Sequence, residues 1–144
     1  MLIQLLPVDI PRYWEPIKHA AVAVDEVDVK QRPAYLRDLL QNLMSSSAQA
    51  WLRVDESREI ASVCITRILH NSQFDEKYLY VQVTYSWKRV PESVWGDDIE
   101  TLKEFGKKEG CKYIGCMSRN PRIWEIVQRD GFKETTRIFA LRLD

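Results

Sequence analysis

The sequence has no net charge, because its 21 basic and 21 acidic residues cancel. It therefore creates no overall field that would attract a polyanion or an acidic membrane surface, and we expect no nucleic-acid partner. It also lacks any apolar run of membrane-spanning length, and the short run Leu2–Leu6 has no basic lead of the kind that begins a signal peptide. These absences predict a soluble protein of the cytoplasm with no membrane partner.

Metal ligands are few in this chain. It has three cysteines with no CxxC pair, and its two histidines lie far from them in the sequence: Cys64, Cys111, Cys116, His19 and His70. Zinc sites need clustered cysteine and histidine ligands, so we expect no metal. An odd number of cysteines is typical of buried reduced thiols, which agrees with a reducing compartment.

Repeats, low-complexity tracts and linkers are also missing, and 144 residues are enough for one compact core. We therefore predict a single domain over residues 1–144. The clearest local signal within it runs from Cys111 to Phe132. An apolar run of strand length precedes Ser118 and Asn120, which can cap a helix that has Pro121 in its first turn, and Gly131 is the expected left-handed stop.

The apolar period changes along the chain from about 3.6 residues to 2 at Ala48. The first part predicts a strand followed by two helices, and the second predicts three antiparallel strands, a helix, a parallel strand, a helix and a last strand or hairpin. The predicted elements are Leu2–Leu6, Tyr13–Val24, Pro33–Leu43, Ala48–Val54, Ile60–Leu69, Tyr78–Tyr85, a helix beginning at Asp97 and Asp98, Tyr113–Met117, the Asn120 helix and Phe132–Leu143.

The strand Tyr78–Tyr85 is bulky at every position, which is typical of a central strand covered on both faces. Simple alternation divides its residues between the two faces of the strand. One face holds Leu79, Val81, Val83 and Tyr85, and the other holds Tyr78, Tyr80, Gln82 and Thr84.

This element order resembles the GNAT superfamily, the fold of acyl-CoA-dependent N-acetyltransferases. In that superfamily the last helix commonly reads Asn, a small residue three positions later, Tyr seven later and Gly-Phe eleven and twelve later. Here those positions hold Asn120, Ile123, Val127, Gly131 and Phe132, so three of the five match. The resemblance implies an α+β fold: a mixed, mostly antiparallel sheet of 6–7 strands, with about four helices on both faces.

The resemblance also implies acetyl-CoA or CoA as cofactor. Backbone N–H groups from Val83 to Tyr85 would hold the pantetheine and thioester, and Asn120 could contact the ligand or only cap its helix. Lys88, Arg89 and Ser93 would hold the phosphates. The sequence departs from the superfamily here, because Ser93 and Trp95 stand where glycines are usual and Asp97 and Asp98 add negative charge.

The implied catalytic groups are few. Val127 stands where the superfamily commonly has the Tyr that protonates the leaving thiolate, a loss that typically costs ~10² to 10⁴ in rate. Tyr85, Cys116 or Ser118 could replace that acid from neighbouring strand ends. The strand Tyr78–Tyr85 contains no carboxylate, so Glu76 or Asp75, in the loop before it, is the candidate base.

Two functions follow from these departures. The first is a GNAT-like protein with degenerate acyl-CoA and catalytic motifs that acts in binding or assembly, and resembles short proteins encoded by tailed bacteriophages, some of them in virions. A protein partner is then expected at Trp87 and Trp95, which lie with basic residues between the fourth strand and the next helix. The alternative is an acetyl-CoA-dependent N-acetyltransferase for an unknown amine.

Overall fold

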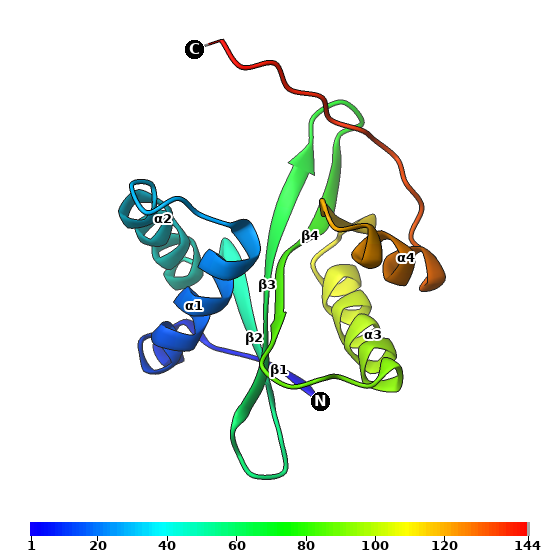
Figure 1. The fold of residues 1–144 in the computed structure, drawn as a ribbon. Coiled ribbons are helices and arrows are strands. Elements are labelled where there is room, and N and C mark those ends of the chain that lie inside the picture. The colour runs from blue at the N-terminus through cyan, green and yellow to red at the C-terminus, as the bar shows by residue number, and fades with distance from the viewer. Residues whose placement is uncertain (144) are drawn as a thin grey trace.

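The computed structural model describes residues 1–143. Its centre is one sheet in the order β1-β2-β3-β4-β5, in which neighbours along the chain are also neighbours in space (Figure 1). The first four strands are antiparallel, and β5 is parallel to β4. The strands are β1 (Leu2–Gln4), β2 (Ala48–Val54), β3 (Ile60–Asn71), β4 (Glu76–Ser86) and β5 (Tyr113–Cys116).

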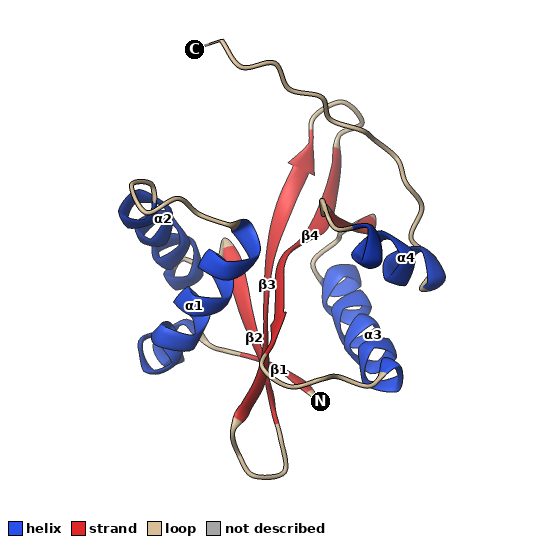
Figure 2. Cartoon of the chain, in the orientation of Figure 1, coloured by secondary structure: helices blue, strands red, loops and turns tan. Residues whose placement is uncertain are grey.

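Four α-helices cover the sheet, two on each face, as Figure 2 shows. After two 3-10 turns, Pro7–Asp9 and Pro11–Tyr13, come α1 (Trp14–Asp25) and α2 (Arg32–Met44) on one face. The opposite face carries α3 (Glu92–Lys108) and α4 (Pro121–Arg129). Among residues 1–143, no helix has both the length and the apolar composition needed to cross a membrane. The predicted α+β architecture is confirmed.

Each face of the sheet has its own apolar core. On the α1–α2 side, Ile17 and Ala20 of α1 pack with Val63, Ile65 and other buried residues of the strands. On the α3 side, a second cluster is built by Leu2, Trp51, Cys64, Leu79 and Leu102. The period-2 alternation of β2 and β3 divides these side chains between the two clusters, as expected for strands that are buried on both faces.

A short chain of polar side chains crosses the α3-side core. The Trp51 indole N–H donates to Thr66 Oγ1 at 2.9 Å, and the Thr66 hydroxyl donates to Gln49 Oε1, also at 2.9 Å. Gln49 Nε2 in turn donates to the Ser46 carbonyl oxygen at 3.1 Å. Thr66 is fully buried, and its hydroxyl is the hydrogen-bond partner of both the Trp51 indole N–H and Gln49 Oε1. No other group in the described chain bonds to these two atoms.

The predicted number of strands is wrong, because the sheet of residues 1–143 has five strands rather than 6–7. The difference lies after α4. Residues 133–143 form no strand or hairpin and are exposed throughout. A strand needs a partner edge, and this segment forms no strand pairing with any part of residues 1–143.

The helix predicted from Asp97 and Asp98 begins earlier, at Glu92. Pro91 precedes it with an extended backbone, and its carbonyl accepts the first helical bonds from Val94 and Trp95. Asp98 is instead a buried residue of α3, ion-paired to Arg53 of β2. Asp97 and Asp98 are therefore inside the helix, and the prediction missed its first five residues, 92–96.

Candidate functional site

β4 and β5 run together for only part of their length. Their parallel pairing extends from Tyr78 opposite Tyr113 to Val81 opposite Cys116. β5 then ends, whereas β4 continues through Gln82–Ser86 with β3 as its only strand neighbour in the described chain. One side of this last part of β4 therefore offers backbone groups that no strand satisfies.

A β-bulge lies at the point where the two strands part. Ile65 pairs with Val83 and its neighbour Thr66 pairs with Val81, so Gln82 is an extra residue on β4. The bulge also shows that the prediction of one shared face for Leu79, Val81, Val83 and Tyr85 is wrong. Val81 joins the α3-side core, whereas Val83 is buried on the α1–α2 side. An extra residue reverses the alternation and leaves its own backbone groups unpaired.

The Gln82 side chain connects the bulge to the ends of α1 and α2. Its Nε2 donates to Asp25 Oδ2 at 3.0 Å and lies 3.4 Å from the Tyr35 hydroxyl oxygen. Tyr35 of α2 donates its own O–H to the same Asp25 carboxylate. Asp25 is exposed at the C-terminal end of α1, where Glu26 has a left-handed backbone. A carboxylate with two donors thus lies one side chain from the bulge.

Burial, and next the hydrogen bond to Asp25, raise the pKa of Tyr35 well above its ordinary value of 10. Tyr35 therefore remains a neutral donor at physiological pH. An open hollow of about 560 Å³ lies beside this group, and its lining comes from the end of α1, the loop after it and α2. The lining residues are Asp25, Glu26, Val27, Lys30, Gln31, Ala34 and Tyr35.

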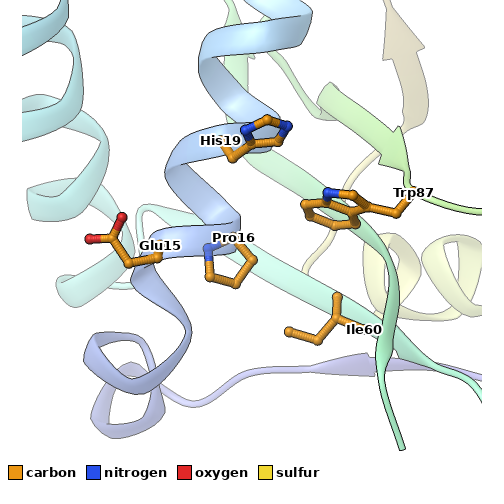
Figure 3. Close-up of a pocket in the computed structure, with 5 residues that line it drawn as sticks. All are labelled: Glu15, Pro16, His19, Ile60 and Trp87. Carbon is orange, nitrogen blue, oxygen red and sulfur yellow. The ribbon is translucent and has the colours of Figure 1, made fainter. Parts of the chain in front are cut away.

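A second group lies nearer the end of β4. His19 Nε2 is 3.2 Å from the Tyr85 hydroxyl, and the His19 ring stacks on Trp87 at a centroid distance of 5.8 Å. Tyr85 also meets Trp87 edge to face. Figure 3 shows His19 and Trp87 facing one another, and both line an open hollow of about 360 Å³. Its lining residues are Glu15, Pro16, His19, Ile60 and Trp87.

The loop between β4 and α3 offers fewer phosphate contacts than the sequence implied. Lys88 is turned to the β2–β3 hairpin, where it forms ion pairs with Asp55 and Glu59. These hydrogen bonds raise the pKa of Lys88, with Asp55 as the main cause. Arg89 is exposed and has no hydrogen bond or ion pair within residues 1–143. Arg89 is therefore the cation that remains available in this loop.

Ser93 and Trp95 lie inside the first turns of α3 rather than in the loop. The helix begins without a side-chain cap, and within the described residues the N–H groups of Glu92 and Ser93 have no partner. Such groups favour an anion. The negative charge of the Glu92 carboxylate disfavours an anion there, although this carboxylate is paired with Arg129 at 2.7 Å. For the CoA that the resemblance implies, this site offers the unpaired backbone of β4 at the thioester end and few groups at the phosphates.

Asn120 and Ser118 stand at the start of α4. Asn120 Oδ1 accepts from the Arg122 N–H at 3.0 Å, which confirms it as the helix cap, and Ser118 Oγ accepts from the Asn120 N–H at 3.1 Å. As Ser118 follows the end of β5 by two residues, it lies close to where the strands part. Its hydroxyl hydrogen has no acceptor within residues 1–143.

The structure does not bring Glu76 to this site. Glu76 begins β4, opposite Asn71, whereas the bulge is six residues further along the strand, about 20 Å at ~3.3 Å per residue. Val83 lies beside the bulge, and Tyr85 lies two residues further along β4. Trp87 lies in the loop after β4, apart in sequence from the helical Trp95, and their role in binding a partner stays a prediction. Within residues 1–143, no three His, Cys, Asp or Glu side chains gather as a metal site.

Sequence reasoning missed Asp25, Tyr35, Gln82 and His19. The stretch that begins at Asp25 reads as a charged connection, and the strand pattern gives Gln82 no special place. A carboxylate at a helix end and a tyrosine in the next helix are too common to mark a site. Only the register of β3 against β4, which sequence periodicity does not specify, places them together.

Comparison with solved structures identifies this architecture. No protein-family model matches the sequence, and comparison with curated proteins finds no match. A predicted acetyltransferase from Clostridium acetobutylicum, solved with acetyl-CoA, is similar with a TM-score of 0.75 at 12% identity, covering 99% of this chain and 96% of its own. A probable acetyltransferase (TM-score 0.73, 12% identity, 100% and 98% covered) is similar too. So is the ribosomal-protein-alanine N-acetyltransferase of Brucella melitensis biovar Abortus 2308 (0.70, 13%, 99% of both chains). The chain therefore has the GNAT fold.

Proposed function

We propose that this protein binds an acyl-CoA where β4 and β5 part and transfers the acyl group to an amine that arrives from the α1–α2 side. The observation that carries this proposal is the bulge at Gln82, which coincides with the last paired residues of β5. A regular strand would pair with β3 at least as well, so the stability of the sheet does not explain an unpaired backbone group at this point. The acetyl-CoA complex of the Clostridium protein supports the choice of cofactor.

When bound, an acyl-CoA supplies an activated thioester carbonyl. The task of the bulge is to donate a backbone N–H to that carbonyl oxygen, on which negative charge develops. One such preorganised donor is typically worth ~10² to 10³ in rate. Because Val83, the next residue, is fully buried and held in register with Ile65, the donor does not have to reorganise during the reaction.

Asp25 has the task of accepting the proton that the amine loses as its nitrogen bonds to the acyl carbon. Its carboxylate is exposed to the hollow between α1 and α2, where an amine can reach it. The hydrogen bonds from Tyr35 and Gln82 fix its position. Before transfer, the same charge attracts a protonated amine, so Asp25 serves both in binding and in proton transfer.

The departing sulfur leaves as a thiolate, and Val127 has no proton to give it. Ser118 can donate a hydrogen bond to that thiolate, because its hydroxyl hydrogen has no other acceptor in the described chain and it lies two residues beyond the end of β5. The thiolate then takes a proton from water, and Asp25 returns the amine's proton to water. Without a general acid, we expect slow turnover with positioning as the main source of catalysis.

A binding protein without acyl transfer is the second candidate. Two observations favour it: Lys88 is held by Asp55 and Glu59, and Glu92 brings a negative charge to the start of α3. Both weaken the hold on a pyrophosphate. Trp87, which is exposed and stacked on His19, would then contact a protein partner.

Calorimetric titration with CoA and acetyl-CoA separates the two candidates. We expect micromolar binding, which corresponds to about 8 kcal/mol, and weaker binding by Arg89→Ala. Arg37→Ala is the matched control, since Arg37 is also exposed but lies on α2. No heat with millimolar ligand would overturn the acyl-CoA proposal and leave the binding protein.

A further inference from the structure

Arg67 of β3 carries a charge that no hydrogen bond or ion pair of residues 1–143 engages. In register it stands between Ala48 of β2 and Tyr80 of β4, and Ala48 belongs to the core on the α1–α2 side. Cross-strand partners share a face of the sheet, so Arg67 lies on that side too. Its Nε atom is buried without an acceptor. Because an unpaired buried donor costs free energy, this Nε indicates a place for an acceptor group of a ligand.

Gln82 has the complementary unpaired atom. Its Nε2 donates to Asp25, so its amide oxygen Oε1 is directed elsewhere, and Oε1 is buried without a donor in residues 1–143. Gln82 follows Tyr80, the partner of Arg67, by two residues, which is about 7 Å at ~3.3 Å per residue. An unpaired donor and an unpaired acceptor are therefore neighbours on one face of the sheet.

Tyr80 lies between two opposite charges. Burial, and next the negative charge of Asp25, raise the pKa of Tyr80, whereas the positive charge of Arg67 lowers it. Both charges thus act on one hydroxyl, which stays protonated and can donate at physiological pH. Tyr35 contributes a second hydroxyl here, because it contacts both Asp25 and Gln82. We call these five residues the Arg67–Asp25 cluster.

The Arg67–Asp25 cluster is reached from the α1–α2 side. Asp25 and Tyr35 line the open hollow of about 560 Å³ described above. Arg67, Tyr80 and Gln82 are each only partly buried, in contrast to the core side chains next to them on β3 and β4. A small polar ligand that enters this hollow therefore meets an anion first and a cation behind it.

We propose that the Arg67–Asp25 cluster binds a free amino acid. The ammonium group would donate to the Asp25 carboxylate and to Gln82 Oε1, and the carboxylate would accept from Arg67 Nε and from the Tyr80 hydroxyl. With one hydrogen bond of ~3 Å at each end, the two charged groups of an amino acid span the separation estimated above. A simple amine would leave Arg67 unpaired, and a simple carboxylic acid would leave Gln82 Oε1 unpaired.

That this amino acid is the acceptor rests on the proposed acyl transfer, whereas its binding does not. In the transfer, the amine nitrogen would bond to the acyl carbon as the carbon–sulfur bond breaks, and Asp25 would take the proton that the nitrogen loses. Arg67 would then be a specificity-determining residue, because it holds the carboxylate and touches no reacting atom.

Calorimetric titration without CoA tests the binding. The probes are the common amino acids and β-alanine, each compared with its amide, which keeps the amine and lacks the charged carboxylate. We expect an amino acid to bind, and its amide to bind about tenfold or more weakly. Arg67→Met should reduce the affinity for the amino acid to that for the amide. Lys30→Met is the matched control, because Lys30 is an exposed cation of the same hollow and should leave the difference intact.

Circular dichroism shows whether Arg67→Met remains folded, as we expect of a residue outside both apolar cores. Tyr80→Phe is the second variant, since it removes only a hydroxyl and should weaken the amino acid more than the amide. Equal affinity for amino acid and amide, no binding by any probe, or unchanged binding by Arg67→Met would overturn the proposal. If acetyl-CoA still acylated other amines, the acyl transfer would stand without it. Amino-acid binding without CoA binding would support this site and remove the acyl transfer.

Discussion

Replacing Thr66 by Val tests whether the polar chain in the α3-side core stabilises the fold. The two side chains have almost the same shape, so the change leaves packing in place and removes only the hydroxyl. The Trp51 N–H and the Gln49 carbonyl oxygen would then both be buried without a partner. Each of the two orphaned groups costs ~1–3 kcal/mol, and the added methyl returns about 1, so we expect a loss of about 1–5 kcal/mol.

Urea denaturation followed by tryptophan fluorescence measures this loss. With a slope of ~2 kcal/mol per molar urea, the midpoint should fall by about 0.5–2.5 M. Thr66→Ser keeps the hydroxyl and loses one methyl group, so it should cost only about 1 kcal/mol. Thr101→Val, on the surface of α3, is the matched control. A Thr66→Val protein as stable as the parent would refute the reasoning, because the hydrogen bonds would then contribute nothing net.

Four further predictions concern single side chains. Burial raises the pKa of the Cys64 thiol from 9 to about 12; the folded state therefore holds its proton more tightly, and stability should fall above pH 9, by about 1.4 kcal/mol at pH 10, a loss that Cys64→Ala should lack in urea melts. Asp98→Asn should cost about 3 kcal/mol or more in urea, because Arg53 would keep a buried charge without its partner; replacing both residues by apolar ones should cost less. Asn120→Ala should cost about 1 kcal/mol through the lost cap of α4, and an unchanged unfolding midpoint would contradict that role. Asp25→Asn should lower the rate of acetyl-CoA-dependent amine acylation by ~10² or more without weakening CoA binding in calorimetry, and equal rates would remove Asp25 as the base.

The strand and helix order was predictable because burial imposes different periods on the two kinds of element. Ala48–Val54 and the two runs after it alternate with period 2, and the structure forms them as β2, β3 and β4. The Asn120 cap and the left-handed Gly131 were also predictable, since each depends only on neighbouring backbone groups. Local rules decide such features.

The candidate site was less predictable because it depends on register. An extra residue at Gln82 changes no composition and breaks no turn rule, yet it decides which face Val83 and Tyr85 occupy. Asp25 reaches this point only because two helices end there. The last strand was misjudged for a related reason: residues 133–143 have strand-forming side chains, but propensity does not show whether such a segment pairs with a sheet edge.

The bulge is the one residue of β4 that the pairing with β3 does not use. Val81 pairs with Thr66 and Val83 with Ile65, so Gln82 stands between them without a partner residue. Deletion of Gln82 would close the bulge and leave every later side chain of β4 on its present face, because Val83 would then follow Val81 directly in a regular strand. We therefore expect a single codon deletion at Gln82 to leave the sheet intact and to remove the irregular backbone and the hydrogen bond to Asp25, whereas deletion of Thr84 would rotate Tyr85 to the wrong face.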